Sequence, residues 1–172
     1  MSKYCFGVDI GGTTIKMGLF TEDCQLVEKW EIPTDKSDNG NNILLDVAKA
    51  IDNKLNEKSI NKEDVLGVGI GVPGPVNRDN VVLKCVNLGW GIFKVGEEVT
   101  KLTGIDNIKV GNDANVAALG EASMAGDKGY SDMVMLTLGT GVGGGVIIIG
   151  KILEGTIGAG GVLGHFQVKF DE

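Results

Sequence analysis

Histidine and cysteine are scarce in this sequence of 172 residues, and their scarcity excludes several kinds of site. His165 is the only histidine, so a catalytic pair of histidines is excluded. The three cysteines, Cys5, Cys24 and Cys85, lie far apart, and none has the C-x-x-C spacing of a metal or redox site. Distant cysteines in odd number are typical of reduced thiols, which predicts a cytoplasmic protein.

Long apolar runs and basic runs are also missing. No run approaches the ~18 apolar residues of a membrane helix, and the first residues lead into a strand pattern without a signal-peptide core. The formal net charge is −7, and no stretch is dense in Lys and Arg. We therefore expect no membrane partner and no nucleic-acid partner, because non-specific binding of nucleic acid needs a basic face.

Glycine, by contrast, is abundant. The 28 glycines cluster at residues 7–18, 67–74, 139–145 and 155–164, each time beside an apolar run. Glycines placed in this way mark turns where the backbone approaches another group closely, whereas linkers scatter glycine among polar residues.

The order of the apolar patterns predicts an α/β fold. Apolar residues at every fourth position of residues 41–55 indicate a helix. The run 133–138 predicts a strand buried on both faces, followed by a glycine turn at 139–145. The complete expectation is strands at 4–10, 14–20, 25–32, 65–72, 108–110, 133–138, 146–149 and 166–170, and helices at 41–55, 94–103 and 113–125.

The first hairpin has the composition of a phosphate-binding turn. It offers backbone amides, two hydroxyls and one cation, from Gly11, Gly12, Thr13, Thr14 and Lys16. Consecutive small residues in a turn form a concave set of N–H donors that suits phosphate oxygens. Asp9 precedes the turn, where its carboxylate could hold Mg²⁺ through water. The alternative is an ordinary hairpin with a glycine turn.

A similar Gly/Thr turn recurs about 130 residues later, at Gly139, Thr140 and Gly141. Two such turns, one in each of two related halves, could hold one triphosphate between them. Asn112 and Asp113 lie between the turns at a predicted junction of strand and helix. A carboxylate in the first helical turn is favoured in its ionised form, so Asp113 could accept a proton. The alternative role for Asp113 is that of a helix cap.

Other nucleotide-binding motifs do not fit. Residues 69–74 and 139–144 both match G-x-G-x-x-G formally, but the first leads into two prolines and the second into a strand. A dinucleotide-binding turn must open a helix. The sequence also has no G-x-x-x-x-G-K-[ST], so it is not a P-loop protein.

Five motifs together resemble the ROK family of sugar kinases and regulators, and most closely its glucokinases. They are residues 9–16 (DIGGTTIK), 71–76 (GVPGPV), 87–90 (NLGW), 112–118 (NDANVAA) and 138–146 (LGTGVGGGV). The resemblance implies the actin/hexokinase-like ATPase fold, with ATP and sugar bound between two domains. On this basis we expect an N-terminal domain with a mixed five-stranded sheet at residues 1–130. Residues 131–172 would be the incomplete start of a second domain.

The resemblance also assigns roles to residues. Asp113 would be the catalytic base on the 6-hydroxyl of glucose, and Gly74, Asn112 and His165 would lie at the sugar. The family's Glu-x-Gly-His segment reads Val-Leu-Gly-His at residues 162–165, so its Glu is replaced by Val162. The two glycine hairpins would hold ATP with Mg²⁺. The family's zinc-binding cysteines would follow later in the chain, so no zinc site is expected here.

Three readings of function remain open. The first is an ATP:hexose kinase, of which this chain is a truncated form, and the second is a non-catalytic fragment. The third is a sugar-responsive regulator of the same family, which the six residues ahead of Gly7 do not favour, because a regulator carries a DNA-binding segment there. An incomplete second sheet would expose apolar edges, so a homo-oligomer is expected.

Overall fold

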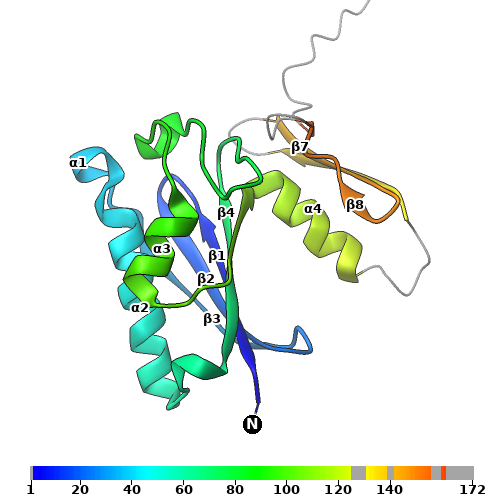
Figure 1. Ribbon diagram of the computed structural model, residues 1–172. Helices are drawn as coiled ribbons and strands as arrows, with labels where there is room; N and C mark the ends of the chain where they lie inside the picture. The colour runs from blue at the N-terminus through cyan, green and yellow to red at the C-terminus, as the bar shows by residue number, and fades with distance from the viewer. Residues whose placement is uncertain (1, 125–130, 139–141, 156–159, 162–172) are drawn as a thin grey trace, which may run out of the picture. The chain divides into compact units, whose positions relative to one another are not determined.

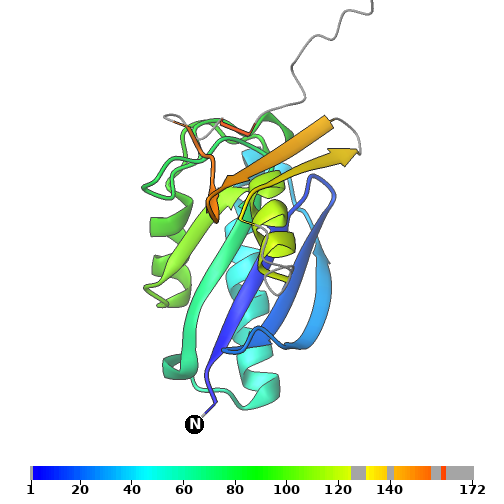
Figure 2. The same cartoon turned by 90° about the vertical axis from the view of Figure 1, so that its right-hand side faces the viewer.

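The computed structural model describes residues 2–124, 131–138, 142–155 and 160–161. The chain divides into two compact units, Met1–Gly111 and Asn112–Glu172. Figure 1 and Figure 2 show the elements of both units. No helix within the described part of the chain is long and apolar enough to span a membrane.

The first unit is built on a five-stranded mixed sheet with the order β3-β2-β1-β4-β5. Strand β1 pairs antiparallel with β2 and parallel with β4, and β2 pairs antiparallel with β3. The strands are β1 (Tyr4–Ile10), β2 (Thr14–Thr21), β3 (Leu26–Pro33), β4 (Val65–Val72) and β5 (Ile108–Asn112). This sheet confirms the mixed five-stranded arrangement predicted from the sequence.

Helices α2 (Asn42–Lys58) and α3 (Val95–Thr103) cover one face of this sheet, as Figure 1 shows. The short helix α1 (Ser37–Gly40) and two 3-10 turns, Lys62–Asp64 and Val86–Leu88, complete the unit. Side chains alternate between the faces of a strand. The core is formed by the inward-facing side chains of the strands and the apolar stripe of α2, including Phe6, Val8, Ile10, Ile15, Met17, Ile43, Val47, Ile51, Val68, Ile70 and Val72.

A buried lysine joins α2 to the edge strand β3. Lys54 is only 8% exposed, and its Nζ lies 2.6 Å from Glu28 and 4.8 Å from the centre of the Trp30 ring. The hydrogen bond from Lys54 lowers the pKa of the Glu28 carboxyl, and Lys58 adds to this effect. The charge of Lys54 is therefore paired, as a buried ammonium requires.

The second unit consists of a helix on a small antiparallel sheet. Helix α4 (Asp113–Met124) packs on β6 (Met133–Leu138) and β7 (Val142–Ile148), and β8 (Lys151–Ile152) completes the order β6-β7-β8. The return strand begins at Val142 rather than at residue 146, so glycines 143–145 belong to β7 and not to the turn. Glycine is needed in this strand because α4 lies close against it: a Cβ on Gly145 would lie 2.5 Å from that of Ala118.

The prediction that residues 133–138 are buried on both faces is wrong. Burial alternates along β6, and the exposed fractions of Val134, Leu136 and Leu138 are 64%, 59% and 82%. Among the described residues of the second unit, the helix covers only one face of this sheet, and the other row of β6 side chains is exposed.

The boundary predicted between residues 130 and 131 remains a prediction, because residues 125–130 lie outside the described part of the chain. The compact units separate at Gly111 and Asn112, ahead of α4, because α4 packs on β6 and β7. The strand predicted at 166–170 also lies outside the described residues.

Candidate functional site

The first predicted phosphate turn is a tight hairpin between β1 and β2. Asp9 pairs with Lys16 across the two strands, and Ile10 pairs with Ile15. Both isoleucines are fully buried, whereas Asp9 and Lys16 are exposed. Because paired residues share a face of the sheet, the carboxylate and the ammonium both lie on the face opposite the α2 and α3 helices.

The turn itself uses one of its amides. The Gly11 N–H donates to the Thr14 carbonyl at 3.1 Å, which closes the hairpin. The Gly12 and Thr13 amides have no backbone acceptor among the described residues, so these two are the donors left for a ligand. Gly11 is needed for its lack of a side chain, since a Cβ there would lie 2.7 Å from the Thr14 carbonyl oxygen.

Thr34, which the sequence analysis missed, braces this turn from the strand end of β3. Its N–H donates to the Thr13 carbonyl at 2.9 Å, and its Oγ1 donates to the Gly11 carbonyl at 2.8 Å. These two hydrogen bonds hold the carbonyl groups of Gly11 and Thr13 against Thr34. No local sequence signal pointed to this residue, because the contact spans more than 20 positions of the chain.

Gly74 lies at the same edge of the sheet as the hairpin. Strand β4 pairs Gly71 with Asp9 and ends at Val72, and the Gly74 amide then donates to the Val72 carbonyl at 2.9 Å. A Cβ on Gly74 would lie 2.5 Å from the Lys84 carbonyl oxygen, so only glycine fits this turn. The structure therefore brings Gly74 and Asp9 to one end of the first unit.

Asn112 is the residue that caps helix α4. Its Oδ1 accepts hydrogen bonds from the amides of Ala114 at 3.1 Å and Asn115 at 3.3 Å. Asp113 is the first residue of the helix, and its Oδ1 also accepts from the Ala114 amide at 2.8 Å. Both side chains are half-buried. The sequence analysis gave helix capping as the alternative role for Asp113. In the structure Asn112 accepts two of the three capping hydrogen bonds, and Asp113 accepts one.

The second predicted phosphate turn, at Gly139, Thr140 and Gly141, lies outside the described residues, and so does His165. The strands that flank this turn are paired up to Leu138 and Val142. Helix α4 and this hairpin belong to one compact unit.

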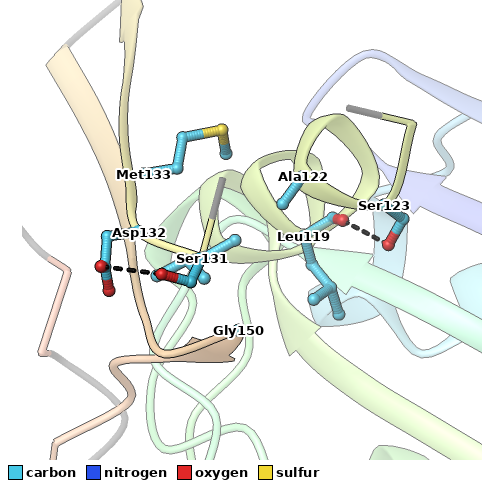
Figure 3. Close-up of a pocket in the computed structure, with 8 residues that line it drawn as sticks. Leu119, Ala122, Ser123, Ser131, Asp132, Met133 and Gly150 are labelled. Atoms are coloured by element: carbon cyan, nitrogen blue, oxygen red, sulfur yellow. Dashed lines mark hydrogen bonds between the residues drawn. The ribbon is translucent and has the colours of Figure 1, made fainter. Parts of the chain in front are cut away.

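A cavity of about 260 Å³ lies between the C-terminal half of α4 and the base of the β6–β7 hairpin (Figure 3). It is lined by Leu119, Ala122, Ser123, Ser131, Asp132, Met133, Ile147 and Gly150. Met133 pairs with Ile147 at the opposite end of the hairpin from Leu138 and Val142. The cavity is therefore separate from the predicted phosphate turn.

Comparison with known protein families identifies the chain. The model of the ROK family matches residues 5–172. The chain belongs to the ROK family. This result confirms the resemblance that the five sequence motifs carried.

Curated relatives of the chain include glucokinases and N-acetyl-D-glucosamine kinases. A glucokinase of Halalkalibacterium halodurans is 42% identical over 167 residues, which cover 96% of this chain and 50% of that protein. An N-acetyl-D-glucosamine kinase of Haemophilus influenzae is 33% identical and covers 96% of this chain and 53% of that protein. The chain spans about half the length of the curated relatives it matches.

Among solved structures, a ROK family glucokinase of Streptomyces griseus in complex with glucose and AMPPNP is similar to the chain. The TM-score is 0.78 at 34% identity, and the match covers 96% of this chain and 51% of that one. The predicted fold class is thereby confirmed for this ROK chain.

Proposed function

We propose that this ROK chain serves in the ATP-dependent phosphorylation of a hexose, with the 6-hydroxyl of glucose as the acceptor. The observation that carries the proposal is Asp113, a half-buried carboxylate at the start of α4, beside an asparagine that caps the helix. The proposed function is supported by the 42% identity to a glucokinase and by the similarity to a glucokinase crystallised with glucose and AMPPNP.

In the proposed reaction the hexose hydroxyl oxygen attacks the γ-phosphorus of ATP. The bond from this phosphorus to the oxygen that bridges it to the β-phosphate breaks, and ADP leaves. Asp113 accepts the hydroxyl proton as the new bond forms. Positioning and charge stabilisation supply most of the catalysis in phosphoryl transfer, so the fixed start of α4 matters as much as the carboxylate.

Sugar contacts are proposed for Asn112, Gly74 and His165. Because the Asn112 Oδ1 is bonded to helix amides, its contact with a hydroxyl would be made by the amide nitrogen. The backbone at Gly74 would approach the sugar at a point where no side chain fits.

Phosphate contacts are proposed for the Gly11–Thr14 hairpin and for Gly139, Thr140 and Gly141. In the first hairpin the Gly12 and Thr13 amides, the threonine hydroxyls and Lys16 would hold phosphate oxygens. Asp9 is an exposed carboxylate at this edge, and no group of three potential metal ligands occurs among the described residues. That donor set suits Mg²⁺ held through water. When bound, Mg²⁺ would offset the charge of the phosphates.

Asp113→Asn tests the proposal, since it keeps the shape of the side chain and removes the base. We expect turnover of glucose, followed by coupled detection of ADP, to fall by ~10²-fold or more. Asp106→Asn, which alters an exposed carboxylate in a loop of the first unit, is the matched control and should keep full turnover. Near-normal turnover in Asp113→Asn would refute the assignment of the base.

The acceptor is tested separately, because the relatives include both glucokinases and N-acetylglucosamine kinases. We expect kcat/KM to be higher for glucose than for N-acetylglucosamine. A chain that binds glucose in calorimetry but releases no ADP would favour the non-catalytic alternative.

A further inference from the structure

The NLGW motif forms most of a tight loop in the first unit. The Cys85 N–H donates to the Trp90 carbonyl at 2.8 Å, and the Trp90 N–H donates to the Cys85 carbonyl at 3.0 Å. Between these bonds the chain makes the 3-10 turn Val86–Leu88 and then Gly89, whose φ of 79° returns it to the bridge. We call residues 86–89 the tip loop.

The tip loop lies beside both turns that the first unit contributes to the proposed site. At its base, a Cβ on Gly74 would lie 3.3 Å from the Cys85 Cβ, and the Cys85 thiol donates to the Pro73 carbonyl at 3.4 Å. At its tip, the Asn87 carbonyl oxygen would lie 4.0 Å from a Cβ on Gly12. The loop therefore joins the turn proposed for sugar to the turn proposed for phosphate. An acceptor hydroxyl must come within about 3 Å of the phosphoryl group, so it has to bind beside both turns.

A buried tryptophan fixes this loop to the core. Trp90 is only 5% exposed, and its Nε1 donates to the Gly40 carbonyl at 3.1 Å. Its ring meets the Phe93 ring edge to face, with centroids 5.0 Å apart, and Leu88 is fully buried. The position of the tip loop is thus set without a ligand, so a ligand that contacts it has little ordering cost to meet.

Two neighbouring side chains of the tip loop are left exposed. Val86 is 74% exposed, whereas Cys85 before it and Leu88 after it are buried. Asn87 is also exposed, and its side-chain amide has no hydrogen-bond partner within the part of the chain that the structure describes. A hexose ring presents C–H groups on its faces and hydroxyls around its rim. An apolar side chain next to an amide, which both donates and accepts, offers partners for each.

We propose that the tip loop is the wall of the hexose site that the first unit contributes. Val86 packs on the C–H groups of the sugar ring, and the Asn87 amide hydrogen-bonds a sugar hydroxyl. The inference rests on the proposed function, because that function makes a hexose the ligand. It adds two binding residues to those that the sequence motifs suggested.

NMR of the wild-type chain tests the contact without catalysis. Titration with glucose should shift the methyl signals of Val86 and the side-chain amide signals of Asn87. Sorbitol, an open-chain polyol, is the matched probe and should leave them in place. Ile92, an apolar residue that is 81% exposed beyond Trp90, is the internal control and should not respond to glucose. Val86 and Asn87 signals that stay in place at the highest soluble glucose concentration would overturn the proposal.

Kinetics test the same two residues by truncation. Val86→Ala and Asn87→Ala should each raise the KM for glucose by ~5-fold, because each loses part of a contact with the acceptor. The kcat and the KM for ATP should stay within about twofold, since a contact made equally in the ground state and the transition state affects binding alone. Ile92→Ala and Asn53→Ala, at exposed positions, are the matched controls and should keep the wild-type KM.

A merely structural loop would give a different result. In that case the truncations would lower the melting temperature and kcat and leave the KM for glucose unchanged, which would overturn the proposal.

The failure of this inference and that of the proposed function can be told apart. A wild-type chain that phosphorylates no hexose would overturn the proposed function, and the glucose titration would then decide the wall alone. A wild-type kinase in which both truncations keep the KM for glucose would leave the proposed function standing and overturn the wall.

Discussion

At the scale of single residues, the turn between β7 and β8 carries the clearest backbone strain. Ile149 has a φ of 52° and Gly150 a φ of 70°, and Ile148 pairs with Lys151 around them. Two left-handed residues between paired positions form a two-residue hairpin of type I′, which favours Asn-Gly. A β-branched residue is costly in this region, and 79% of Ile149 is exposed. The Ile149 amide donates to Asp132 Oδ1 at 2.7 Å, which holds the turn.

Ile149→Asn is therefore expected to stabilise the second unit by about 1 kcal/mol, because asparagine tolerates the left-handed conformation. Thermal denaturation should show a higher melting temperature. Ile148→Asn alters an exposed isoleucine in the neighbouring strand position and should bring no such gain. Equal effects of the two substitutions would contradict the strain argument.

At the scale of elements, the contact between α4 and β7 depends on small residues on both sides. A Cβ on Gly145 would lie 2.5 Å from that of Ala118 and 2.9 Å from the Ala114 carbonyl oxygen. Gly120, on the same helix, has nothing within 4 Å of such a Cβ. The helix therefore approaches β7 most closely at glycine positions. This close packing holds α4, which begins at Asp113, against the β6–β7 hairpin.

Alanine substitutions at these two glycines should have opposite effects. Gly145→Ala forces the helix away from the strand and should destabilise the unit by ~1–3 kcal/mol. Gly120→Ala adds a methyl group in open space and should stabilise the helix by ~1 kcal/mol. Urea titrations of both variants measure the difference, and a neutral Gly145→Ala would show that the packing is looser than described.

At the scale of the whole chain, the exposed row of β6 is the feature that bears on assembly. Val134, Leu136 and Leu138 lie on one face, and Val142, opposite Leu138, is 52% exposed. Apolar rows of this kind mark contact surfaces or aggregation sites. The homo-oligomer predicted from the sequence rests on this argument and remains a prediction.

Light scattering should accordingly give the chain a mass above that of one copy. Leu136→Lys places a charge in the middle of the row and should shift the population toward the monomer. Leu45→Lys, at an exposed leucine of α2 that is 40% accessible, is the control and should leave association unchanged. A compact monomer in the wild-type chain would contradict the prediction.

Much of the fold was predictable because its signals are local. The four-residue repeat of residues 41–55 predicted α2, and the runs at residues 4–10 and 14–20 predicted the strands β1 and β2. The five motifs predicted the ROK family, which the family match confirms. The candidate residues for phosphate and sugar came from the same motifs, apart from His165, which came from the segment at residues 162–165, and their roles remain proposals.

The sequence by itself determined the order of most elements and the family, because side-chain periodicity and motif spacing act over a few residues. Only the tertiary structure decided which carbonyls of the first turn are used, since Thr34, which follows β3, donates to those of Thr13 and Gly11. It also decided that glycines 143–145 lie in a strand, that one row of β6 is exposed, and that the tip loop lies beside Gly74 and Gly12. These features depend on which element packs on which face, and residues distant along the chain determine that packing.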